Sequence, residues 1–591
     1  MIDSTKPLHE QVQDADVLVP TTGPVDAQAI RSAKKLKLIV TPATGYSNID
    51  IEAAAEIGIP VCTSPGVNAA SVAEAALMMM LARQAREQEA SFQRGDIGVP
   101  FGIQLAGKRL GIVGMGNTGA RLARAAEALE MQVIPITSHI SRADIEEMLR
   151  SCMFVSLHCP LTPKTRGLIG RAELAMMPQG SMIVNYARGE VIDKEALEEA
   201  LASGHIGGAG LDAHHEEPAD PSGPLYQHPN VIAHPHTGGS TQDVVEMYSS
   251  LLLENTPYNL PPWADNVLRG QTVGAHNFVR DFVHKMPGKD EQWHILWCLD
   301  AWHILYNALE MKLPPWCTLH MIDITKPLHE QVANMDVLVP TTGTVDAQAI
   351  CSAKKLKLIV QPATGYSNID VETAAELGIP VCNSPGVNAA SVAEAALMTM
   401  LMLARRAREQ EAVFRRRGIG EPFGIQLGGK RLGIVGMGNI GGRLARAAEA
   451  LEMQVIPITS HSSRADIEEM LRSCMCVSLH CPLTPKTRGL IGRAELAMMP
   501  QGSMIINYAR GEVIDKEALV EALSSGHIGG AGLDAHHEEP ADPSEPLYQH
   551  PNVIATPHTG VSTQDVVEMY SSLLVDNIVR RKEGKALLHR L

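Results

Sequence analysis

Short apolar runs alternate with longer alanine-rich segments along most of the chain. Runs such as KLKLIV, RLGIVGMG, MQVIPIT and NVIA are separated by stretches such as ARLARAAEALE, in which apolar residues recur at helical spacing. Strands that alternate with helices predict parallel sheets joined by right-handed crossovers. The pattern therefore predicts an α/β fold.

The whole pattern occurs twice. KPLHEQV at Lys6 returns at Lys326, and the match continues almost to the end of the 591-residue chain. A repeat of this length is a whole protein, because solenoid units have periods of only about 20 to 50 residues. We name residues 1–263 copy one and residues 264–591 copy two.

Copy one is two residues shorter inside the helical run SVAEAALMMMLAR. Ser71 and Ser391 are 320 residues apart, whereas Arg83 and Arg405 are 322 residues apart. At about 100° per residue, the loss of two residues rotates everything beyond it by about 200°. We therefore expect this helix of copy one either to repack or to aim its later side chains at different partners.

The stretch between the repeats contains all five tryptophans, so it is not a flexible Gly/Ser linker. NVLRG, HNFVRDFVHKM and WHILWC predict a strand, a helix and a strand. We expect these to form the opening βαβ unit of copy two, which copy one lacks because its Met1 already aligns with Met321. Residues 299–320 match no element of the pattern, and we expect an insertion there.

Composition narrows the class of protein. The chain has 66 acidic against 50 basic residues, a net charge of -16, which disfavours nucleic acid as a partner. Ten cysteines are sparse for this length, and most stand in apolar or proline-flanked runs, as expected of reduced thiols inside a cell. No run of about 18 apolar residues exists, so we expect no membrane span and a cytoplasmic protein.

A glycine motif follows one predicted strand in each copy. KRLGIVGMGNIGG, from Lys430, places Gly436, Gly438 and Gly441 between a strand and a helix. The first glycine allows a tight turn, the second lets the backbone approach a pyrophosphate, and the third lets helix and strand pack closely. We expect a dinucleotide site there, and a second one in copy one at Gly114, Gly116 and Gly119.

The cofactor is NADP or NAD. An acidic residue that binds the adenosine ribose is expected about 20 residues beyond the glycines, but Thr459 and Thr137 stand near that place. Without the carboxylate a 2'-phosphate is not repelled, and Thr459, Ser460 and Arg464 are polar groups that can bind one. The sequence therefore slightly favours NADP.

Three further stretches occur in the same order in both copies. They are NYARGEVID, HHEEP, and HPHTG or TPHTG. With ATGYSNID, SVAEAAL, GIVGMGNIG and VSLHCPLTPKTRGLIG, they resemble the D-isomer-specific 2-hydroxyacid dehydrogenases, the family of phosphoglycerate dehydrogenase and glyoxylate/hydroxypyruvate reductase. The resemblance covers nearly all of both copies.

The resemblance implies a role for each matching residue. Arg510 would bind the substrate carboxylate and keto oxygen with its planar fork. His558 would be the general acid/base, and Glu539 would stabilise its imidazolium form. Asp534 would hold the nicotinamide carboxamide. The backbone N–H groups of Thr364 and Gly365 would bind the substrate carboxylate. The copy-one equivalents of the first four are Arg188, His236, Glu217 and Asp212.

The LDAHHEEP stretch also admits a metal site. We expect no metal, because four adjacent residues at the exit of a strand point in alternating directions and cannot converge on one ion. Only the second glutamate, Glu539, is expected to have a catalytic role, and the two histidines are interpreted as loop residues.

The resemblance also implies an architecture. Each copy would have a doubly wound Rossmann nucleotide-binding domain and a flavodoxin-like substrate domain, which is incomplete in copy one. The expected boundaries are 1–92 for the truncated substrate domain of copy one, 93–235 for its nucleotide-binding domain, 236–263 for its C-terminal segment and linker, 264–413 for the substrate domain of copy two, 414–562 for its nucleotide-binding domain, and 563–591 for the return to the substrate domain.

Departures from the family pattern leave two function classes open. Between Thr459 and SRADIEEML too few residues remain for the family's next strand, and copy one adds the helix deletion and His234 in place of Thr556. The first class is an NAD(P)-dependent reductase of a small 2-oxo acid, with copy two as the working unit. The second is a non-catalytic nucleotide sensor or scaffold. Family members dimerise through their nucleotide-binding domains, so we expect either an intramolecular pseudo-dimer or a homo-oligomer.

Overall fold

The computed structural model describes residues 6–20, 24–41, 48–138, 141–254, 292–300, 302–341, 343–366 and 368–591. The chain divides into two compact units. Unit 1 contains Met1–Leu252 and Asn388–Gln564, and unit 2 contains Leu253–Val387 and Asp565–Leu591. Both nucleotide-binding domains therefore belong to unit 1.

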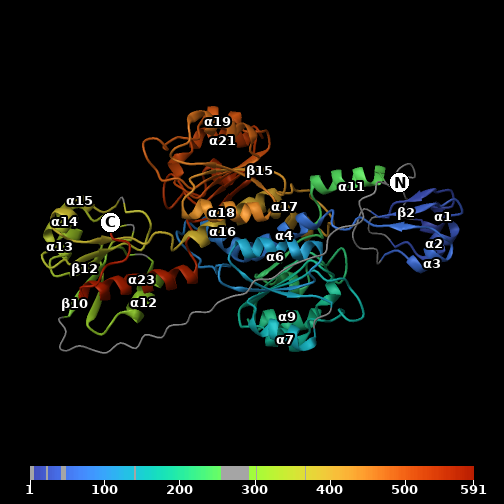
Figure 1. Cartoon of the computed structure of the whole chain (residues 1–591), viewed down its shortest axis with the longest axis horizontal. Helices are drawn as coiled ribbons and strands as arrows, with labels where there is room; N and C mark the ends of the chain where they lie inside the picture. Colours follow the sequence, from blue (N-terminus) through green and yellow to red (C-terminus); the bar gives the residue numbers. More distant parts are fainter. Residues whose placement is uncertain are drawn as a thin grey trace. The chain divides into compact units, whose positions relative to one another are not determined.

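Two six-stranded parallel sheets form the centre of unit 1 (Figure 1). In copy one the strand order is β5-β4-β6-β7-β8-β9 and in copy two it is β16-β15-β17-β18-β19-β20. The strands of copy one are β4 (Arg109–Val113), β5 (Gln132–Ile136), β6 (Phe154–Leu157), β7 (Ser181–Asn185), β8 (Ile206–Leu211) and β9 (Val231–Ala233). Those of copy two are β15 (Arg431–Val435), β16 (Gln454–Ile458), β17 (Cys476–Leu479), β18 (Ser503–Asn507), β19 (Ile528–Leu533) and β20 (Val553–Ala555). The predicted α/β class and the Rossmann-like halves are confirmed.

Helices cover both faces of each sheet, because successive strand residues point to opposite sides. In copy one the helices are α4 (Ala69–Leu81), η1 (Ala82–Gln84), α5 (Ala85–Gln93), α6 (Asn117–Ala128), α7 (Arg142–Ser151), α8 (Arg171–Met176), η2 (Gly189–Val191), α9 (Lys194–Ala202), α10 (Pro224–Gln227) and α11 (Gln242–Glu254). In copy two they are α16 (Ala389–Ala404), α17 (Ala407–Arg415), α18 (Asn439–Ala450), α19 (Arg464–Ser473), α20 (Arg493–Met498), η3 (Gly511–Val513), α21 (Lys516–Ser524) and α22 (Pro546–Gln549). Leu110 and Ile112 pack under α4 and α6, whereas Val113 faces the core under α7, α8 and α9.

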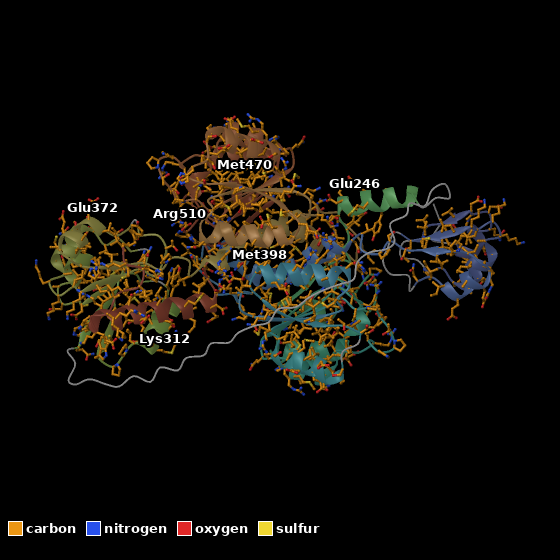
Figure 2. All side chains as sticks on the ribbon, in the orientation of Figure 1. Glu246, Lys312, Glu372, Met398, Met470 and Arg510 are labelled. Atoms are coloured by element: carbon orange, nitrogen blue, oxygen red, sulfur yellow. The ribbon has the colours of Figure 1, made fainter. Side chains whose placement is uncertain are left out.

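The two nucleotide-binding domains share one hydrophobic core. It joins α4 and α6 of copy one to α16 and α18 of copy two, and it includes Met398 of α16 (Figures 1 and 2). A buried glutamate crosses in each direction: Glu74 accepts from the N–H groups of Leu427 (3.0 Å) and Gly428 (2.8 Å). Glu394 accepts in the same way from Leu105 (2.8 Å) and Ala106 (2.9 Å).

This core moves one expected boundary. We expected residues up to 413 to belong to the substrate domain of copy two, but α16 and α17 both belong to unit 1. The reason is that both faces of α16 are apolar, so it is buried between the two copies. The change from unit 2 to unit 1 lies between Val387 and Asn388.

Unit 2 has one five-stranded parallel sheet with the order β11-β10-β12-β13-β14. Its strands are β10 (Trp293–Trp297), β11 (Cys317–Met321), β12 (Val337–Val339), β13 (Leu358–Val360) and β14 (Val381–Cys382). Its helices are α12 (His303–Lys312), α13 (Leu328–Gln331), α14 (Ala347–Ser352), α15 (Val371–Glu376) and α23 (Gln564–Lys582), of which α23 starts at the last residue of unit 1.

The expected insertion at 299–320 is wrong. These residues form α12 and most of β11, and β11 pairs in parallel with β10 over five residues. Among the described residues the first βαβ unit of copy two is therefore β10-α12-β11, and WHILWC contains its first strand. The other two predicted elements, NVLRG and HNFVRDFVHKM, lie outside the described residues.

The N-terminal part of copy one is smaller. Its described residues form a three-stranded parallel sheet with the order β1-β2-β3. The elements are α1 (Leu8–Gln11), β1 (Val17–Leu18), α2 (Ala27–Ser32), β2 (Leu38–Val40), α3 (Ile51–Glu56) and β3 (Val61–Cys62). All ten cysteines are free, and none of the described helices is long and apolar enough to cross a membrane.

Candidate active site

The glycine turn between β15 and α18 has the geometry that the motif predicts. Gly436 has φ 101°, and a Cβ there would lie 2.7 Å from the backbone of His480 and Cys481. A Cβ on Gly441 would collide with the carbonyl oxygen of Gly436, whereas one on Gly438 would meet nothing within 4 Å. The first and third glycines are therefore required for packing, and the second leaves open space in front of the N-terminus of α18, where a pyrophosphate fits.

Gly114, Gly116 and Gly119 have the same properties in copy one. Gly114 has φ 103° and closely approaches the backbone of His158, while a Cβ on Gly116 would meet nothing within 4 Å. The residues of both turns fit a dinucleotide.

The adenosine end of the motif differs from one of our expectations. Thr459 is exposed directly after β16, and so is Thr137 after β5. Their role in binding the adenosine ribose stays a prediction. Arg464 is half-exposed and ion-paired with Glu468 (3.1 Å) and with Glu495, so a 2'-phosphate would compete with these two carboxylates for its guanidinium. The sheet ends at β16, because Ser463 already caps α19 four residues after Thr459.

His558 and Glu539 form the centre of the candidate site. His558 Nδ1 lies 2.8 Å from one carboxylate oxygen of Glu539 and 2.9 Å from the other. His558 has φ 55°, a left-handed conformation that is uncommon for residues other than glycine and is found more often at functional sites. Burial lowers the pKa of His558, but the bond to Glu539 and the nearby Asp534 raise it above its ordinary value on balance.

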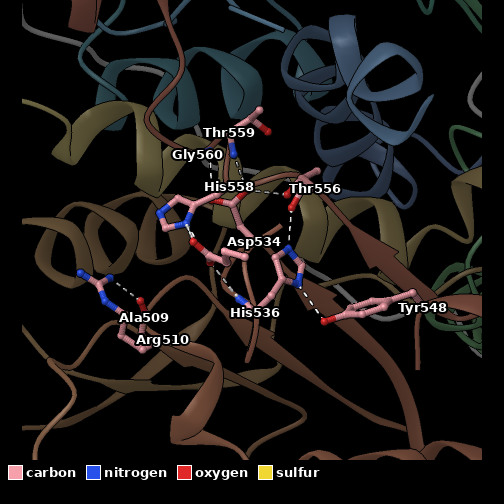
Figure 3. Close-up of polar contacts among 10 residues, drawn as sticks. Ala509, Arg510, Asp534, His536, Tyr548, Thr556, His558, Thr559 and Gly560 are labelled. Atoms are coloured by element: carbon pink, nitrogen blue, oxygen red, sulfur yellow. Dashed lines mark hydrogen bonds and ion pairs between the residues drawn. The ribbon is translucent and has the colours of Figure 1, made fainter. Parts of the chain in front are cut away.

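Arg510 lies on the same side of the site as His558 (Figure 3). It follows β18, and Asn507 fixes its backbone by donating to the Arg510 carbonyl (2.9 Å) and accepting from Ala509 N–H (3.0 Å). Its guanidinium donates to the carbonyl of Ala509 (2.7 Å) and is close enough to His558 to oppose the rise of the imidazole pKa. The structure thus brings together three of the predicted residues from separate loops.

Asp534 organises the turn that contains His558. Its buried carboxylate accepts from the N–H groups of Thr559 (2.7 Å) and Gly560 (2.9 Å) and from the hydroxyl of Thr556 (2.7 Å). Burial raises the pKa of Asp534 to about 6. These bonds hold the residues on both sides of His558.

The two histidines of the HHEE stretch have structural roles that sequence reasoning missed. His536 is buried, and its ring contacts the Tyr548 hydroxyl (3.1 Å) and the Thr556 carbonyl (2.9 Å). His537 contacts the carbonyl of Ile514 (3.0 Å). The side chains of His536, His537 and Glu539 thus have different partners, and no metal-binding group of His, Cys, Asp or Glu occurs among the described residues.

Copy one has the same arrangement. His236 Nδ1 lies 2.8 Å from Glu217, and the pKa of His236 is also raised on balance, since Glu217 and Asp212 outweigh burial. Arg188 donates to the carbonyl of Ala187 (2.7 Å), as Arg510 does to Ala509. Asp212 accepts from Thr237 and Gly238 N–H groups (2.7 and 2.8 Å).

One substitution distinguishes the two sites. His234 replaces Thr556, and among the described residues its buried Nε2 has no hydrogen-bond partner. Burial lowers the pKa of His234 to about 3. Copy one therefore lacks the hydroxyl that binds the buried aspartate in copy two.

A segment of each copy crosses to the histidine turn of the other. Gly98 and Gly102 of copy one donate to the carbonyls of Pro557 (2.6 Å) and Ser562 (2.7 Å). In the opposite direction Gly420 donates to Pro235 (2.6 Å) and Gly424 to Ser240 (3.0 Å). We did not identify these residues from the sequence, where only the PFG tripeptide marks both segments.

Thr364 and Gly365 lie in unit 2 in an exposed loop after β13. Asn383 donates to the Thr364 carbonyl (2.9 Å) and Gln361 to the Gly365 carbonyl (3.0 Å). These bonds brace the loop; its role in binding a substrate carboxylate stays a prediction.

The same family is identified by comparison with known proteins. The model of the D-isomer specific 2-hydroxyacid dehydrogenase NAD binding domain matches residues 75–238 and again 397–560. The chain therefore belongs to this family and contains its nucleotide-binding domain twice.

Relatives with named activities are similar to parts of the chain. A D-3-phosphoglycerate dehydrogenase of Methanocaldococcus jannaschii is 40% identical over 42% of this chain and 50% of its own length. A glyoxylate reductase of Thermococcus litoralis is 38% identical over 44% of this chain and 84% of its own length. The chain thus spans about half the length of that phosphoglycerate dehydrogenase. A crystal structure of a protein from Thermus thermophilus is 34% identical and covers 50% of this chain and 99% of its own, with a TM-score of 0.46.

Proposed function

We propose that the protein is an NAD(P)-dependent dehydrogenase that interconverts a small 2-oxo acid and the D-2-hydroxy acid. The observation that carries the proposal is the His558–Glu539 pair, held in a left-handed turn beside Arg510. An imidazole with a raised pKa next to a guanidinium suits a substrate that has a carboxylate beside a carbonyl.

The residues of the chain divide the chemistry between them. Arg510 binds the carboxylate and polarises the keto oxygen. Glu539 holds Nδ1 of His558, so Nε2 carries the proton that passes to the keto oxygen during reduction and returns during oxidation. The nicotinamide, when bound, supplies or accepts the hydride. Asp534, which fixes the turn, is proposed to bind its carboxamide.

We assign catalysis to copy two. Its substrate sheet has five described strands against three in copy one. Thr556 donates to Asp534, whereas the Nε2 of the equivalent His234 has no hydrogen-bond partner among the described residues. The order β11-β10-β12-β13-β14 supports a flavodoxin-like substrate domain. Copy one completes the nucleotide-binding pair within one chain, as the core shared by α4, α6, α16 and α18 supports.

The substrate class is a small 2-oxo acid of the glyoxylate, hydroxypyruvate or phosphohydroxypyruvate type. The printed activities of the relatives support this range, because they are phosphoglycerate dehydrogenases, glyoxylate reductases and a hydroxypyruvate reductase. The cofactor is NAD or NADP. Free thiols at all ten cysteines support a reducing compartment, and we propose the cytoplasm.

The test is the oxidation of NADH and NADPH by the full chain with glyoxylate, hydroxypyruvate and phosphohydroxypyruvate. We expect turnover with at least one combination of nucleotide and 2-oxo acid. The rate should fall by at least about 100-fold in Arg510→Ala, and it should change little in the matched control Arg188→Ala. Equal losses in the two variants would contradict the assignment to copy two.

A non-catalytic nucleotide sensor or scaffold is the second candidate. It is favoured by the sheet that ends at β16, beside the expected adenosine pocket. Saturable binding of NADH without turnover of any 2-oxo acid would support this candidate over the enzyme.

A further inference from the structure

Arg405 of copy two is buried in the candidate site of copy one. It follows α16, is 1% exposed, and donates from Nη2 to the carbonyls of Thr237 (2.8 Å) and Gly238 (2.6 Å). Its Nη1 donates to the hydroxyl of Ser71. Thr237 and Gly238 directly follow His236, so a guanidinium from one copy holds the histidine turn of the other.

The buried charge of Arg405 has a partner. Burial raises the pKa of Glu74 to about 7, while the charge of Arg405 acts in the opposite direction. Glu74 is itself bound to Leu427 and Gly428 of copy two. Arg405 is therefore part of a polar network across the two copies. Such a network is expected around a buried guanidinium, because the free-energy cost of removing its charge from water must be offset by opposite charges and hydrogen bonds.

The equivalent position in copy two contains a cavity. A cavity of about 50 Å³ is lined, among other residues, by Arg83 of copy one and by Ser391, Glu394, Thr559 and Gly560 of copy two. The last four carry the comparison with copy one. These are the counterparts of Ser71, Glu74, Thr237 and Gly238, which surround Arg405. Ser71, Thr237 and Gly238 accept from the Arg405 guanidinium in copy one. Their counterparts line a cavity in copy two, where Ser391 donates to the Gly560 carbonyl (2.7 Å).

The two-residue deletion explains the difference. The sequence equivalent of Arg405 is Arg83, but its side chain lies against Gly207 and Gly208 of its own copy, and its Nη1 has no partner among the described residues. Gly208 is the counterpart of Gly530. In copy two Leu403 takes the corresponding place, because it lies 3.0 Å from where a Cβ on Gly530 would be. α4 has kept its original register, so Arg83 is aimed where Leu403 points in copy two.

The change in contacts that the two-residue deletion causes ends within a few residues. η1 replaces the end of the longer helix, and Arg86 then pairs with Glu411 (3.1 Å) as Arg408 pairs with Glu89 (3.2 Å). Arg86 and Arg408 also donate to equivalent carbonyls, those of Val231 (2.8 Å) and Val553 (2.6 Å). Beyond η1 the two copies therefore make equivalent contacts again. The contact that the deletion removes is the one from an arginine of copy one to the His558 turn.

We propose that Arg405 is a positioning residue that ties the His236 turn of copy one to copy two, and that the shortened α4 has removed the equivalent tie from the His558 turn. At this position copy two therefore holds the histidine turn of copy one, whereas copy one does not hold that of copy two. The description of these turns as parts of candidate active sites rests on the proposed function, but the positioning by Arg405 does not.

Hydrogen exchange of the full chain measured by mass spectrometry tests the proposal without using activity. The peptides HPHTGGSTQ and TPHTGVSTQ differ in mass, so the two histidine turns are observed separately. In Arg405→Met we expect exchange at 236–241 to rise about tenfold or more, because bonds from a charged donor are lost. Exchange at 558–563 should stay unchanged, and the matched control Arg83→Met should change neither turn.

Further arms exclude a merely structural role. Arg405→Lys keeps the charge without the planar fork, and we expect a smaller rise at 236–241. In Arg405→Ala, millimolar guanidinium chloride, but not sodium chloride, should restore protection there. Insertion of Met-Leu after Leu81 should increase protection at 558–563. No change at 236–241 in any Arg405 variant, or equal changes in both turns, would overturn the proposal. Normal exchange results without turnover would instead overturn only the proposed function.

Discussion

Phe92 of copy one packs against His536 of copy two, with ring centroids 5.2 Å apart. Phe414 packs against His214 in the same way at 5.1 Å. The first histidine of each HHEE stretch thus contacts the other copy. In copy two this histidine, His536, also contacts the carbonyl oxygen of Thr556, two residues before His558. The contact between the copies and the candidate sites are therefore built from the same residues.

Replacement of Phe92 by alanine tests this contact. Phe92 is 3% exposed, so we expect a loss of about 3 to 5 kcal/mol in the free energy of unfolding of unit 1. Denaturant unfolding followed by circular dichroism measures the loss, and Phe414→Ala is the matched variant. A loss below about 1 kcal/mol in both variants would show that the rings do not pack as described.

The pH dependence of reduction tests the His558–Glu539 pair. In the proposed mechanism reduction needs the imidazolium of His558, so the rate should fall as pH rises through the raised pKa of this residue. Glu539→Gln removes the charge that raises the pKa, and the fall should move to lower pH. Initial rates between pH 5 and 9 measure the shift, with Glu217→Gln as the control. An unchanged profile in Glu539→Gln would separate Glu539 from the proton transfer.

The same pair also contributes to stability. Because the folded-state pKa of His558 is raised, its contribution is fully present below the unfolded value of about 6.5 and is lost as pH rises through the folded value. The difference in unfolding free energy between the wild type and Glu539→Gln should therefore shrink with rising pH. Urea unfolding at several pH values measures it, and a difference that grows with pH would contradict the raised pKa.

Alanine substitutions at three glycines in α18 and the turn before it distinguish a role in packing from a role in nucleotide binding. Gly436→Ala should destabilise the fold, since its φ is positive and its Cβ would meet the backbone at 2.7 Å. Gly438→Ala has open space, so it should fold normally and bind NADH at least about tenfold more weakly.

The matched control is Gly442→Ala, which also meets nothing within 4 Å and which copy one already has as Ala120. It should bind normally and be stabler by about 0.5 to 1 kcal/mol. Thermal unfolding and titration calorimetry with NADH measure both properties. Normal NADH binding by Gly438→Ala would place the pyrophosphate elsewhere.

Replacement of Arg464 tests whether its guanidinium contributes to a preference for NADP. It is ion-paired with Glu468 and Glu495, so Arg464→Ala should change the ratio of the NADPH and NADH dissociation constants by less than about twofold. Titration calorimetry with both nucleotides measures the ratio. A large loss for NADPH alone would show that the guanidinium leaves its glutamates to bind a 2'-phosphate.

Strands, helices and the nucleotide turn could be predicted because their signals are local. Glycine spacing and alternating apolar runs fix β15, the turn at Gly436 and α18 within a few residues. The order NYARGEVID, HHEEP, TPHTG gave Arg510, Glu539 and His558 as candidates. The structure brings these together at the ends of β18, β19 and β20.

What could not be predicted depends on contacts between distant segments. The β10-α12-β11 unit was missed because copy one has no counterpart of α12 to compare with. The ion pair of Arg464 with Glu495 and the place of Phe92 against His536 join residues with no sequence relationship. The two-residue deletion predicted a rotated side chain, but only the structure shows that Arg83 turns to Gly207 while Arg405 crosses to copy one.

The most direct measurement is the rate of NADH and NADPH oxidation with the three 2-oxo acids in His558→Asn and His236→Asn, compared with the wild type. The account predicts turnover by the wild type, a loss of at least about 100-fold in His558→Asn, and near wild-type rates in His236→Asn. Full activity in His558→Asn, with normal folding and nucleotide binding, would contradict it.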